Sequence, residues 1–469
     1  MTDILKWSLV MITYIITIIK PRYGIGFVIF FLPLASRYIY LGKIQISLLV
    51  FMVIALLPGL LANALNQKKG INKKENKLEN KEVIILFLLS IMTSFIGYIY
   101  NGLPANVTIL NYEVEVSNLI NYIAVMISSM VLYAILVKNI YSGKDWFFYI
   151  KIFLSGLLFL GVIYILSGPL HLNLPGFLQP ITVDEYGQEI RGVSESIFAQ
   201  TRFAGYVGYY ENFVEYLVIE IALAIILIFK RKKRLDLIWG ISVIGTSLLF
   251  GLISGTRSFP ILLIINFILI LVFQLRGGVK KQSIYSGILA IGGFVIIYLS
   301  LPFFSDSLLV TRFSSMGIHN LTDVFALLTA DPGNSFFTLI NRGNMLIYFD
   351  QIIKTSGFIG VGPLTIHTLS GTDMVFHSSY YGIYVSLGLL GLISFLLLNV
   401  KIMNGLRQAL KNNKSEIMYS ICLSLIITLL IDGIKVSFWR IPPTVFIYWF
   451  VFALIASFTH LWKAGNWNY

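Results

Sequence analysis

Charged side chains and cysteine are scarce in this chain. Only 12% of its 469 residues are charged, whereas soluble globular domains carry roughly 25%. So little charge leaves too little polar surface to keep a chain of this length in water. The single cysteine, Cys422, excludes an intrachain disulfide and a metal site built from cysteines. The scarcity of charge therefore indicates that a bilayer surrounds most of the chain.

Several signals of nucleotide and metal chemistry are also missing. No Gly-rich loop ends in Lys-Ser or Lys-Thr, which argues against a nucleotide-driven pump. The five histidines are scattered, without the His-Glu-x-x-His spacing of a zinc site. No Asp-x-Asp pair is present to hold a metal against a nucleotide sugar. No cleavable signal peptide is predicted, because the first apolar run continues into further runs. We expect neither a cofactor nor a metal.

Long apolar runs are what the chain does have. It is 57% hydrophobic, its mean hydropathy is +0.82, and its apolar runs are about 16–22 residues long without strict alternation. That length fits membrane helices, whereas barrel strands have about 10 alternating residues. The runs fall at 4–19, 23–40, 44–65, 83–100, 117–137, 146–166, 213–229, 237–253, 260–275, 283–302, 379–400, 417–434 and 444–461.

The sequence therefore predicts an all-α, polytopic membrane protein that forms one domain over residues 1–469. The first two runs are short and are joined by Lys20-Pro21-Arg22. They are either two spans or one span and a re-entrant segment, so the count is 12 or 13 transmembrane helices. No internal repeat is visible, which weakens the case for an inverted-repeat transporter.

The distribution of positive charge predicts the orientation. The net charge is +13, and Lys and Arg cluster in 66–82, 230–236, 276–281 and the loop after 400. If the runs alternate sides, these loops share one side, which the positive-inside rule makes cytoplasmic. The basic residues thus set orientation, and we do not expect nucleic acid as a partner.

Two long loops are predicted on the opposite, outer side. They are 167–212 and 303–378, and both are rich in aromatic residues, Gly, Pro and isolated charges. Loops of this length are usually functional or disordered, and this composition is unlike that of a disordered tail. We expect them to form structured caps over the outer end of a helix bundle.

The segment 337–395 contains two candidate catalytic residues. His377 lies directly before a long apolar run, at the predicted outer surface. A histidine there can accept a proton from an attacking hydroxyl, or it can simply cap the helix. Arg342 opens an amphipathic stretch that is predicted to lie along the membrane interface. It can bind a diphosphate through paired hydrogen bonds, or it can be an interface anchor.

Two further arginines lie in predicted outer turns. Arg257 is in the tight turn Ser254-Gly-Thr-Arg-Ser258 between two apolar runs. An arginine at this depth must face water, a headgroup or a ligand, and a snorkelling contact with lipid phosphate is the alternative to a ligand. Arg440 follows Trp439 and precedes Pro442-Pro443 in an outer turn that is predicted to line the same cavity.

An arginine, three tyrosines and a glutamate at the outer end of run 213–229 suggest sugar binding. They are Arg202, Tyr206, Tyr209, Tyr210 and Glu211. Tyrosine rings stack on sugar faces, and their polar tips form hydrogen bonds. The alternative is an aromatic belt at the membrane interface.

Charge within the apolar runs is a further functional signal. Glu215 and Glu220 lie inside run 213–229, and ionisable residues within a membrane are functional candidates by default. Asp432 and Lys435 are three positions apart near the outer end of their run. A structural ion pair on one helix face is the expected account of these two.

The order of the outer motifs resembles the O-antigen ligase and Wzy-type O-antigen or capsule polymerase family. The resemblance covers about residues 200–395, and its motifs are the turn around Arg257, the arginine Arg342, Gly360-Val-Gly-Pro363, and His377 before a helix with Gly388-Leu-Leu-Gly391. Upstream, Arg202-Phe-Ala-Gly205 followed by Glu211-Asn212 is similar to the family's Arg-x-x-Gly and Pro-Asn motif. The chain departs from the family pattern at Ser378, where Asn is usual, at Glu211, where Pro is usual, and at Val385-Ser386-Leu387, where an acidic residue is common.

This resemblance implies a C-type glycosyltransferase-like helical membrane fold and an active site on the outer face of the cytoplasmic membrane. It implies transfer of a glycan from undecaprenyl diphosphate to an acceptor hydroxyl, without a metal and with inversion. His377 would be the base, Arg257 and Arg342 would hold the diphosphate, and Arg202 and Tyr206 would be secondary contacts. The implied partners are the undecaprenyl-diphosphate-linked glycan and membrane lipid, with a chain-length regulator and a flippase beside them.

Three alternatives remain beside a polysaccharide polymerase. A ligase that transfers the glycan to lipid A–core shares the same motifs. A lipid-linked oligosaccharide flippase is a transporter and would be expected to show repeated halves and charges deep in many helices. A non-enzymatic membrane scaffold would not need Arg and His clustered in ordered outer loops.

Overall fold

The computed structural model of the chain describes its helical core and a few short segments outside it. The described residues are 2–34, 38–41, 44–67, 80–100, 116–167, 170, 172, 174, 181–183, 189–191, 202–205, 210–230, 233–254, 256, 258–276, 359–360, 379–409, 417–434, 442–465 and 467. The predicted span 283–302 and the interfacial helix predicted within 303–378 lie outside this part of the chain.

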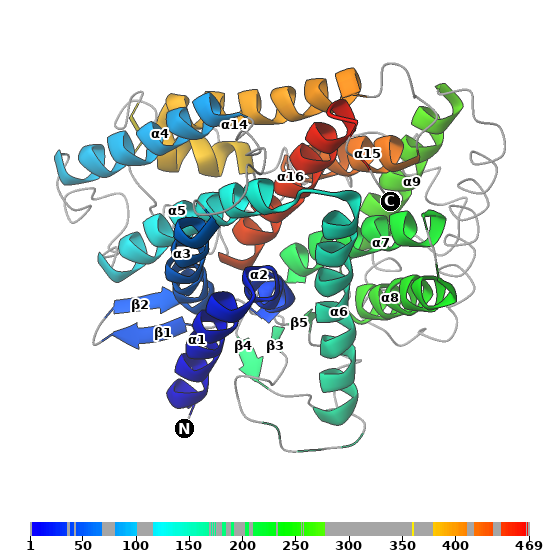
Figure 1. Ribbon diagram of the computed structural model, residues 1–469, viewed down its shortest axis with the longest axis horizontal. Coiled ribbons are helices and arrows are strands. Elements are labelled where there is room, and N and C mark those ends of the chain that lie inside the picture. The colour runs from blue at the N-terminus through cyan, green and yellow to red at the C-terminus, as the bar shows by residue number, and fades with distance from the viewer. Residues whose placement is uncertain are drawn as a thin grey trace, which may run out of the picture.

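Apolar helices make up nearly all of the described chain (Figure 1). They are α1 (Thr2–Ile19), α2 (Pro21–Phe30), α3 (Leu48–Gln67), α4 (Lys81–Tyr100), α5 (Val116–Asn139), α6 (Gly143–Ser167), α7 (Tyr210–Phe229), α8 (Arg234–Ile253), α9 (Ser258–Arg276), α14 (Ser379–Ala409), α15 (Ile417–Asp432) and α16 (Pro442–Lys463). Strands are limited to a hairpin of β1 (Tyr38–Leu41) and β2 (Ile44–Ser47), and an antiparallel sheet of order β4-β3-β5, with β3 (Ile181–Val183), β4 (Glu189–Arg191) and β5 (Arg202–Gly205).

The helices confirm the predicted class, an all-α polytopic membrane protein. Among the described residues, seven helices are long and apolar enough to cross a membrane, and three further apolar helices are shorter. The shorter ones are Ile4–Ile19, Leu48–Ala62 and Ile417–Asp432. Exposed Leu, Ile, Val and Met side chains on the outer helices are what a surface facing lipid requires, since no water is available there for polar groups.

The predicted span 23–40 is wrong as a single helix. α2 has only 10 residues, which at 1.5 Å per residue reach about 15 Å, half the apolar thickness of a bilayer. A 3-10 turn at Leu32–Leu34 follows α2, and Tyr38 then begins the hairpin by pairing with Ser47. Pro33 cannot donate the backbone hydrogen bond that would continue the helix. This geometry favours the re-entrant alternative for the second apolar run.

α7 and α16 form the centre of the bundle. In their membrane-length segments, 89% of α7 and 94% of α16 is buried inside the protein. α16 runs through the middle of the structure (Figure 1) and contacts α5, α6, α7 and α14. α7 contacts α6, α8, α9, α15 and α16. Polar side chains on these two helices therefore face protein instead of lipid.

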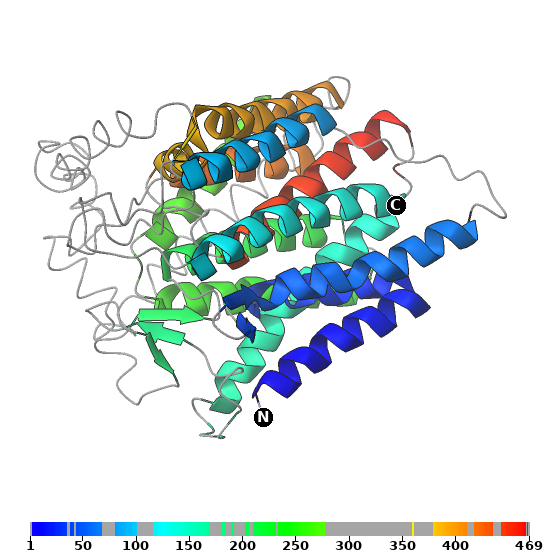
Figure 2. The same ribbon diagram turned by 90° about the vertical axis from the view of Figure 1, so that its left-hand side faces the viewer.

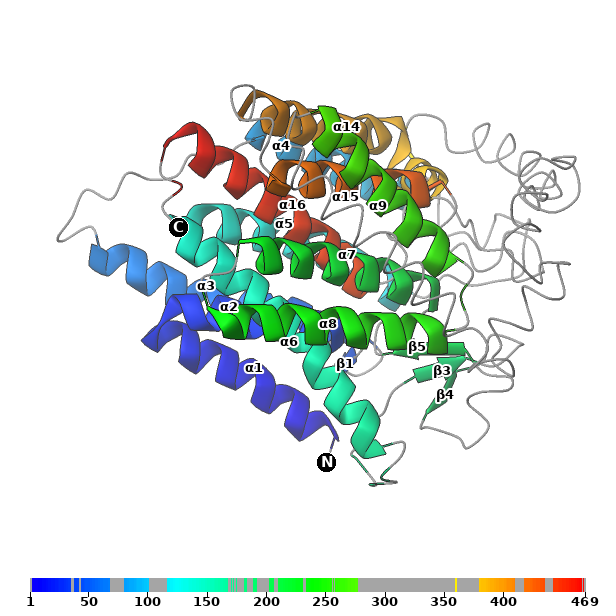
Figure 3. The same ribbon diagram turned by 90° about the vertical axis from the view of Figure 1, so that its right-hand side faces the viewer.

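The bundle has two distinct ends. The β4-β3-β5 sheet lies at one end and the C-terminal end of α16 at the other (Figures 2 and 3). The last turn of α16 carries His460 and Lys463. The three strands come from the predicted outer loop 167–212, so they and the basic end of α16 lie at opposite ends of the bundle. The end that holds the sheet is called the sheet end below.

At the opposite end, Asp236 joins α8 to α6. Its carboxylate accepts a hydrogen bond from the backbone N–H of Lys233 at 3.4 Å, which caps α8. The same carboxylate pairs with the Lys151 ammonium on α6. The Lys151 side chain is 36% exposed, so solvent weakens the ion pair, and the two contacts together fix the start of α8.

We expect Asp236→Ala to destabilise the protein by about 1–2 kcal/mol, because the variant loses this hydrogen bond and the ion pair with Lys151 together. The measurement is thermal unfolding in detergent, followed by the loss of the monodisperse peak in gel filtration. Glu82→Ala is the matched control, since Glu82 pairs with Lys401 in an exposed bridge of 3.2 Å. Equal midpoints for the two variants would contradict a stabilising role for Asp236 at the start of α8.

Candidate functional site

The first eleven residues of α7 carry three buried polar side chains. Asn212, Glu215 and Glu220 are 1%, 3% and 0% exposed. The Asn212 side-chain amide donates a hydrogen bond of 3.0 Å to one Glu215 carboxylate oxygen. The two residues are three positions apart and so share one helix face. This bond holds the Glu215 carboxylate in one orientation.

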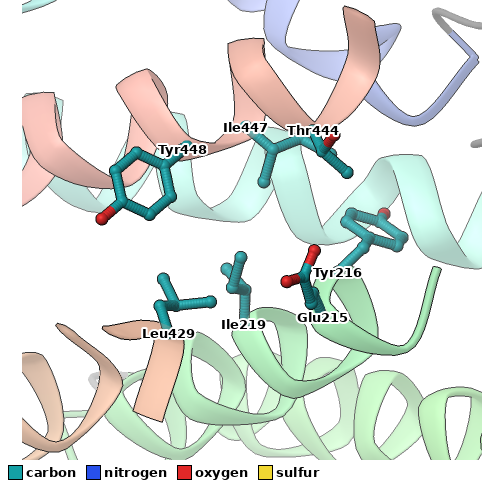
Figure 4. A pocket seen from close by; sticks show the side chains of 7 residues that line it. All are labelled: Glu215, Tyr216, Ile219, Leu429, Thr444, Ile447 and Tyr448. Carbon is teal, nitrogen blue, oxygen red and sulfur yellow. The ribbon is translucent and has the colours of Figure 1, made fainter. Parts of the chain in front are cut away.

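The Glu215 carboxylate lines a cavity between α7, α15 and α16. The cavity is small, with a volume of about 10 Å³, which is room for about one water molecule. Its lining residues are Glu215, Tyr216, Ile219, Leu429, Thr444, Ile447 and Tyr448. Figure 4 shows the carboxylate directed from α7 toward Thr444 and Ile447 on α16. One acidic group and three hydroxyl-bearing side chains thus converge in an otherwise apolar space.

The cavity lies near the sheet end of the bundle. Glu215 follows Tyr210, the first residue of α7, by five positions, which is about 7.5 Å along the helix axis. Thr444 is two positions from the start of α16, and Leu429 is three positions before the end of α15. All three helix ends meet there, beside the outer connections that the sequence predicts to carry the chemistry.

The sheet packs directly on the start of α7. An added Cβ at Gly205, the last residue of β5, would lie 2.5 Å from the Phe213 ring, so backbone and ring are in close contact. Arg202 is the first residue of β5. Tyr210 and Glu211 form the beginning of α7. For these last three residues only the backbone is described, and it runs along the same end of the bundle as the cavity.

α14 begins against the end of α15. The Ser379 backbone N–H donates to the Gly433 carbonyl at 2.8 Å, and the Tyr380 hydroxyl donates to the Leu430 carbonyl at 2.7 Å. Carbonyls in the last turn of a helix need partners from outside the helix, and α14 supplies them. The start of α14, which directly follows Ser378, is thereby fixed beside the helix that contributes Leu429 to the cavity.

The first glycines of two motifs that are distant in the sequence meet within this region. Gly360 belongs to Gly360-Val-Gly-Pro363, and an added Cβ there would lie 2.5 Å from the backbone nitrogen of Gly388. Gly388 opens the Gly-Leu-Leu-Gly repeat and breaks α14 into two helical segments, with φ 70° and ψ −171°. The Ser94 hydroxyl of α4 donates to the Ser386 carbonyl just before this break. The contact holds Gly360 against the bend in α14.

α9 runs antiparallel to α15. The Asn266 amide donates to the Thr428 hydroxyl at 3.2 Å, and the Gln274 amide donates to the Ser420 hydroxyl at 3.0 Å. Hydrogen bonds between polar side chains join neighbouring helices inside a membrane. The first residue of α9 therefore lies at the same end of the bundle as the last residue of α15.

The structure brings together helices that adjoin most of the predicted site residues. The residues themselves lie outside the described part of the chain: Tyr206, Tyr209, Arg257, Arg342, His377, Lys435 and Arg440. The helices that follow Arg257, His377 and Arg440 in sequence are α9, α14 and α16. α15 contacts both α9 and α14, while α16 contacts α14. The roles predicted for these side chains, and the Asp432–Lys435 pair, stay predictions.

Glu220 is a buried acid of a different kind. It lies one helical turn after Tyr216 on α7 and does not line the cavity. The Tyr216 hydroxyl is close enough to interact with it, but not in hydrogen-bond geometry. Among the described residues, neither Glu220 oxygen has a hydrogen-bond partner. Glu220 thus provides an internal comparison for Glu215.

The α16 side of the cavity was not anticipated from the sequence. Thr444 and Tyr448 are four positions apart, and the Tyr448 hydroxyl donates to the Asn399 amide oxygen of α14 at 3.1 Å. A hydroxyl pair at this spacing in an apolar run is a weak signal, because both residue types are common in membrane helices. Together with the acid in run 213–229, it could have suggested two facing helices.

The comparisons with known proteins do not assign the chain to a family. No protein-family model matches the chain, and no curated protein is similar to it. Within the described residues, no group of three or more His, Cys, Asp or Glu side chains could hold a metal ion. The sequence motifs and the arrangement of the helix ends are therefore what indicate a function for this protein.

Proposed function

We propose that this membrane protein polymerises oligosaccharide repeat units carried on undecaprenyl diphosphate, forming an O-antigen or a capsular or exopolysaccharide. The reaction is a glycosyl transfer on the outer face of the cytoplasmic membrane. The family resemblance supplies the class of reaction. The observation that carries the proposal is the contact between Gly360 and Gly388, because it joins two motifs of that resemblance that are far apart in sequence.

The geometry of the helix ends supports the same proposal. A lipid-linked sugar donor has a membrane-embedded tail, an anionic head and a polar glycan. It needs cations at headgroup depth and polar groups near the outer end of the bundle. The buried carboxylate of Glu215 lies about 7.5 Å from the start of α7. Arg257, His377 and Arg440 each occur just before a helix that begins at this same end.

The proposed reaction is a single displacement. The acceptor hydroxyl attacks the anomeric carbon of the donor sugar and forms the new glycosidic bond. The bond from that carbon to the diphosphate oxygen breaks, and its electron pair leaves with undecaprenyl diphosphate. The acceptor proton goes to His377, which acts as the general base. Arg257 and Arg342 balance the charge that develops on the leaving diphosphate. An attack from the opposite side inverts the anomeric centre.

Deletion of the gene in its own host tests this function. Loss of the enzyme is expected to leave single lipid-linked repeat units on the outer face of the membrane and to abolish long polysaccharide. The lipid-linked fraction and the surface polysaccharide are measured by mass spectrometry and by gel. Complementation with the intact gene restores the long product and is the control for effects on neighbouring genes.

Other outcomes of the deletion contradict a polymerase. Long glycans that accumulate on undecaprenyl diphosphate indicate a ligase. Single repeat units that remain on the cytoplasmic face indicate a flippase. Unchanged polysaccharide together with an unchanged lipid-linked pool leaves only a structural role.

A further inference from the structure

The turn between α1 and α2 lies against the start of α6, at the end of the bundle opposite the sheet. The Tyr23 ring of α2 meets the Phe148 ring of α6 edge-on, with ring centroids 5.5 Å apart. The Trp146 ring of α6 contacts Trp467, just beyond the end of α16. α7 also ends on this side (Figures 2 and 3), directly before the basic loop 230–236. The positive-inside rule predicts that this end is cytoplasmic.

Three cations gather at this turn. Lys20 precedes α2, Arg22 is the second residue of α2, and Lys144 is the second residue of α6. All three are exposed, and they are called the basic cluster below. The Arg22 guanidinium lies 3.5 Å from the Lys144 carbonyl oxygen and pairs with Asp145 at 3.2 Å. Among the described residues, neither Lys20 nor Lys144 pairs with a carboxylate, so the cluster keeps two net positive charges beside Asp145.

Aromatic rings hold two of these cations in place. The Arg22 guanidinium lies over the Phe148 ring, 4.1 Å from its centroid. The Lys20 ammonium lies over the Tyr23 ring, 5.7 Å from its centroid. Contacts of this length between a cation and a ring are attractive, and the two rings also touch each other. The cations are therefore ordered before a ligand arrives, which lowers the entropic cost of binding.

The surroundings of the basic cluster are apolar and exposed. Ile18 and Ile19, in the last turn of α1, are 44% and 69% exposed, as side chains that face acyl chains are. Tyr23 is 52% exposed, and aromatic residues of this kind are typical of the headgroup level of a membrane. A soluble anion would contact only the cations. A ligand that covers both the cations and the isoleucines needs an anionic head and an apolar tail.

We propose that the basic cluster binds the phosphate of an anionic phospholipid, with the acyl chains along the exposed side of α1. Arginine presents its N–H groups in a fork that matches phosphate, and lysine adds a point charge. The cytoplasmic leaflet carries the anionic lipids that such clusters attract, in agreement with the predicted orientation. The site is independent of the proposed function, because it lies at the opposite end of the bundle from the cavity and the start of α7.

The double variant Lys20→Gln, Lys144→Gln tests the proposal, since both side chains are exposed and the pair of Arg22 with Asp145 stays intact. Purified, delipidated protein in detergent is titrated with phosphatidylglycerol, and bound lipid is measured by native mass spectrometry. We expect the dissociation constant to rise by roughly ten- to thirtyfold, the range for two lysines near an anionic headgroup. Phosphatidylcholine, which has no net charge, is expected to bind the unaltered protein roughly tenfold more weakly than phosphatidylglycerol.

The matched control is the double variant Arg407→Gln, Lys463→Gln, which removes two exposed positive charges at the same end. An added Cβ at Gly405 of α14 would lie 3.9 Å from the Lys463 ammonium nitrogen, so these charges belong to the α14 side of the bundle. The control is expected to bind phosphatidylglycerol as the unaltered protein does. Gel filtration verifies that each variant is folded.

The outcomes distinguish a defined lipid site from general attraction to a basic surface. A loss of affinity that is confined to the variant of Lys20 and Lys144 supports the site. Equal losses in the two double variants, or no loss in either, overturn it. Equal affinity for phosphatidylcholine and phosphatidylglycerol also overturns it. Glycerol phosphate that displaces the lipid at a similar concentration would show that acyl chains contribute nothing, and would overturn a phospholipid as the ligand.

Discussion

Gly388→Ala is expected to reduce both the thermal stability and the activity of the protein severely. The φ of 70° and ψ of −171° at this position belong to a backbone region that is essentially restricted to glycine. A side chain there costs on the order of 1–3 kcal/mol. The backbone of Gly360 also packs against this bend: an added Cβ at Gly360 would lie 2.5 Å from the Gly388 backbone nitrogen. Relief of strain by straightening α14 would therefore break this contact.

The consequence extends to the start of α14. The segment from Ser379 to Leu387 is fixed on α15 by the bonds of Ser379 and Tyr380. If Gly388 becomes helical, this segment must change its direction relative to the rest of α14. The start of α14, which follows the proposed base His377, would then lose its contact with α15.

Thermal unfolding in detergent and polymer length in complemented cells are the two measurements for Gly388→Ala. Gly245→Ala is the matched control, since Gly245 is exposed on α8 with no atom within 4 Å of an added Cβ. Gly360→Ala is expected to behave like Gly388→Ala. Normal stability and normal polymer in both of these variants would contradict the described contact.

His377→Ala is expected to reduce polymerisation by roughly 10²- to 10⁴-fold, the usual contribution of a general base. The acceptor hydroxyl would lose the group that takes its proton, while donor binding through the arginines would remain. The rate of chain growth is therefore expected to fall with little change in the donor concentration that gives half the maximal rate. Purified protein and lipid-linked repeat units provide this measurement.

His460→Ala is the matched histidine control. His460 lies in the last turn of α16, at the opposite end of the bundle from the sheet (Figures 2 and 3). Its variant is expected to retain full activity. Full activity in a folded, membrane-inserted His377→Ala protein would remove His377 from the mechanism.

Most of the helices could be predicted from the sequence, because each apolar run must satisfy its backbone hydrogen bonds internally in a bilayer. Run 213–229 corresponds to Tyr210–Phe229, and the run that ends at 461 corresponds to Pro442–Lys463. Run 23–40 was different. Its apolar residues form a short helix and a strand, and hydrophobicity alone does not separate a buried strand from a short buried helix.

The sequence contains a glycine motif at Gly388, but this motif does not by itself predict a bend in the helix. Glycine is common inside membrane helices, so a Gly-Leu-Leu-Gly stretch does not indicate that a helix breaks there. The break depends on the approach of Gly360, 28 positions earlier in the chain. Contacts of this kind arise from tertiary packing and have no local signature.

Only the α7 side of the cavity could be predicted from the sequence. Glu215 could be identified from the sequence as a charge within an apolar run, but Thr444 and Tyr448 are ordinary residues of a membrane helix. Only the packing of α7 against α16 places them opposite the carboxylate. The same packing distinguishes Glu215 from Glu220, which the sequence treats alike.

The most direct test of the central claim is the reaction itself. Purified protein in nanodiscs receives undecaprenyl-diphosphate-linked repeat units, without nucleotide sugar, and the glycans are separated on a gel. A polymerase yields a ladder of lengthening glycans and releases one undecaprenyl diphosphate for each bond formed. Intact protein that gives no ladder, or that transfers glycan only when lipid A–core is added, would contradict a polymerase.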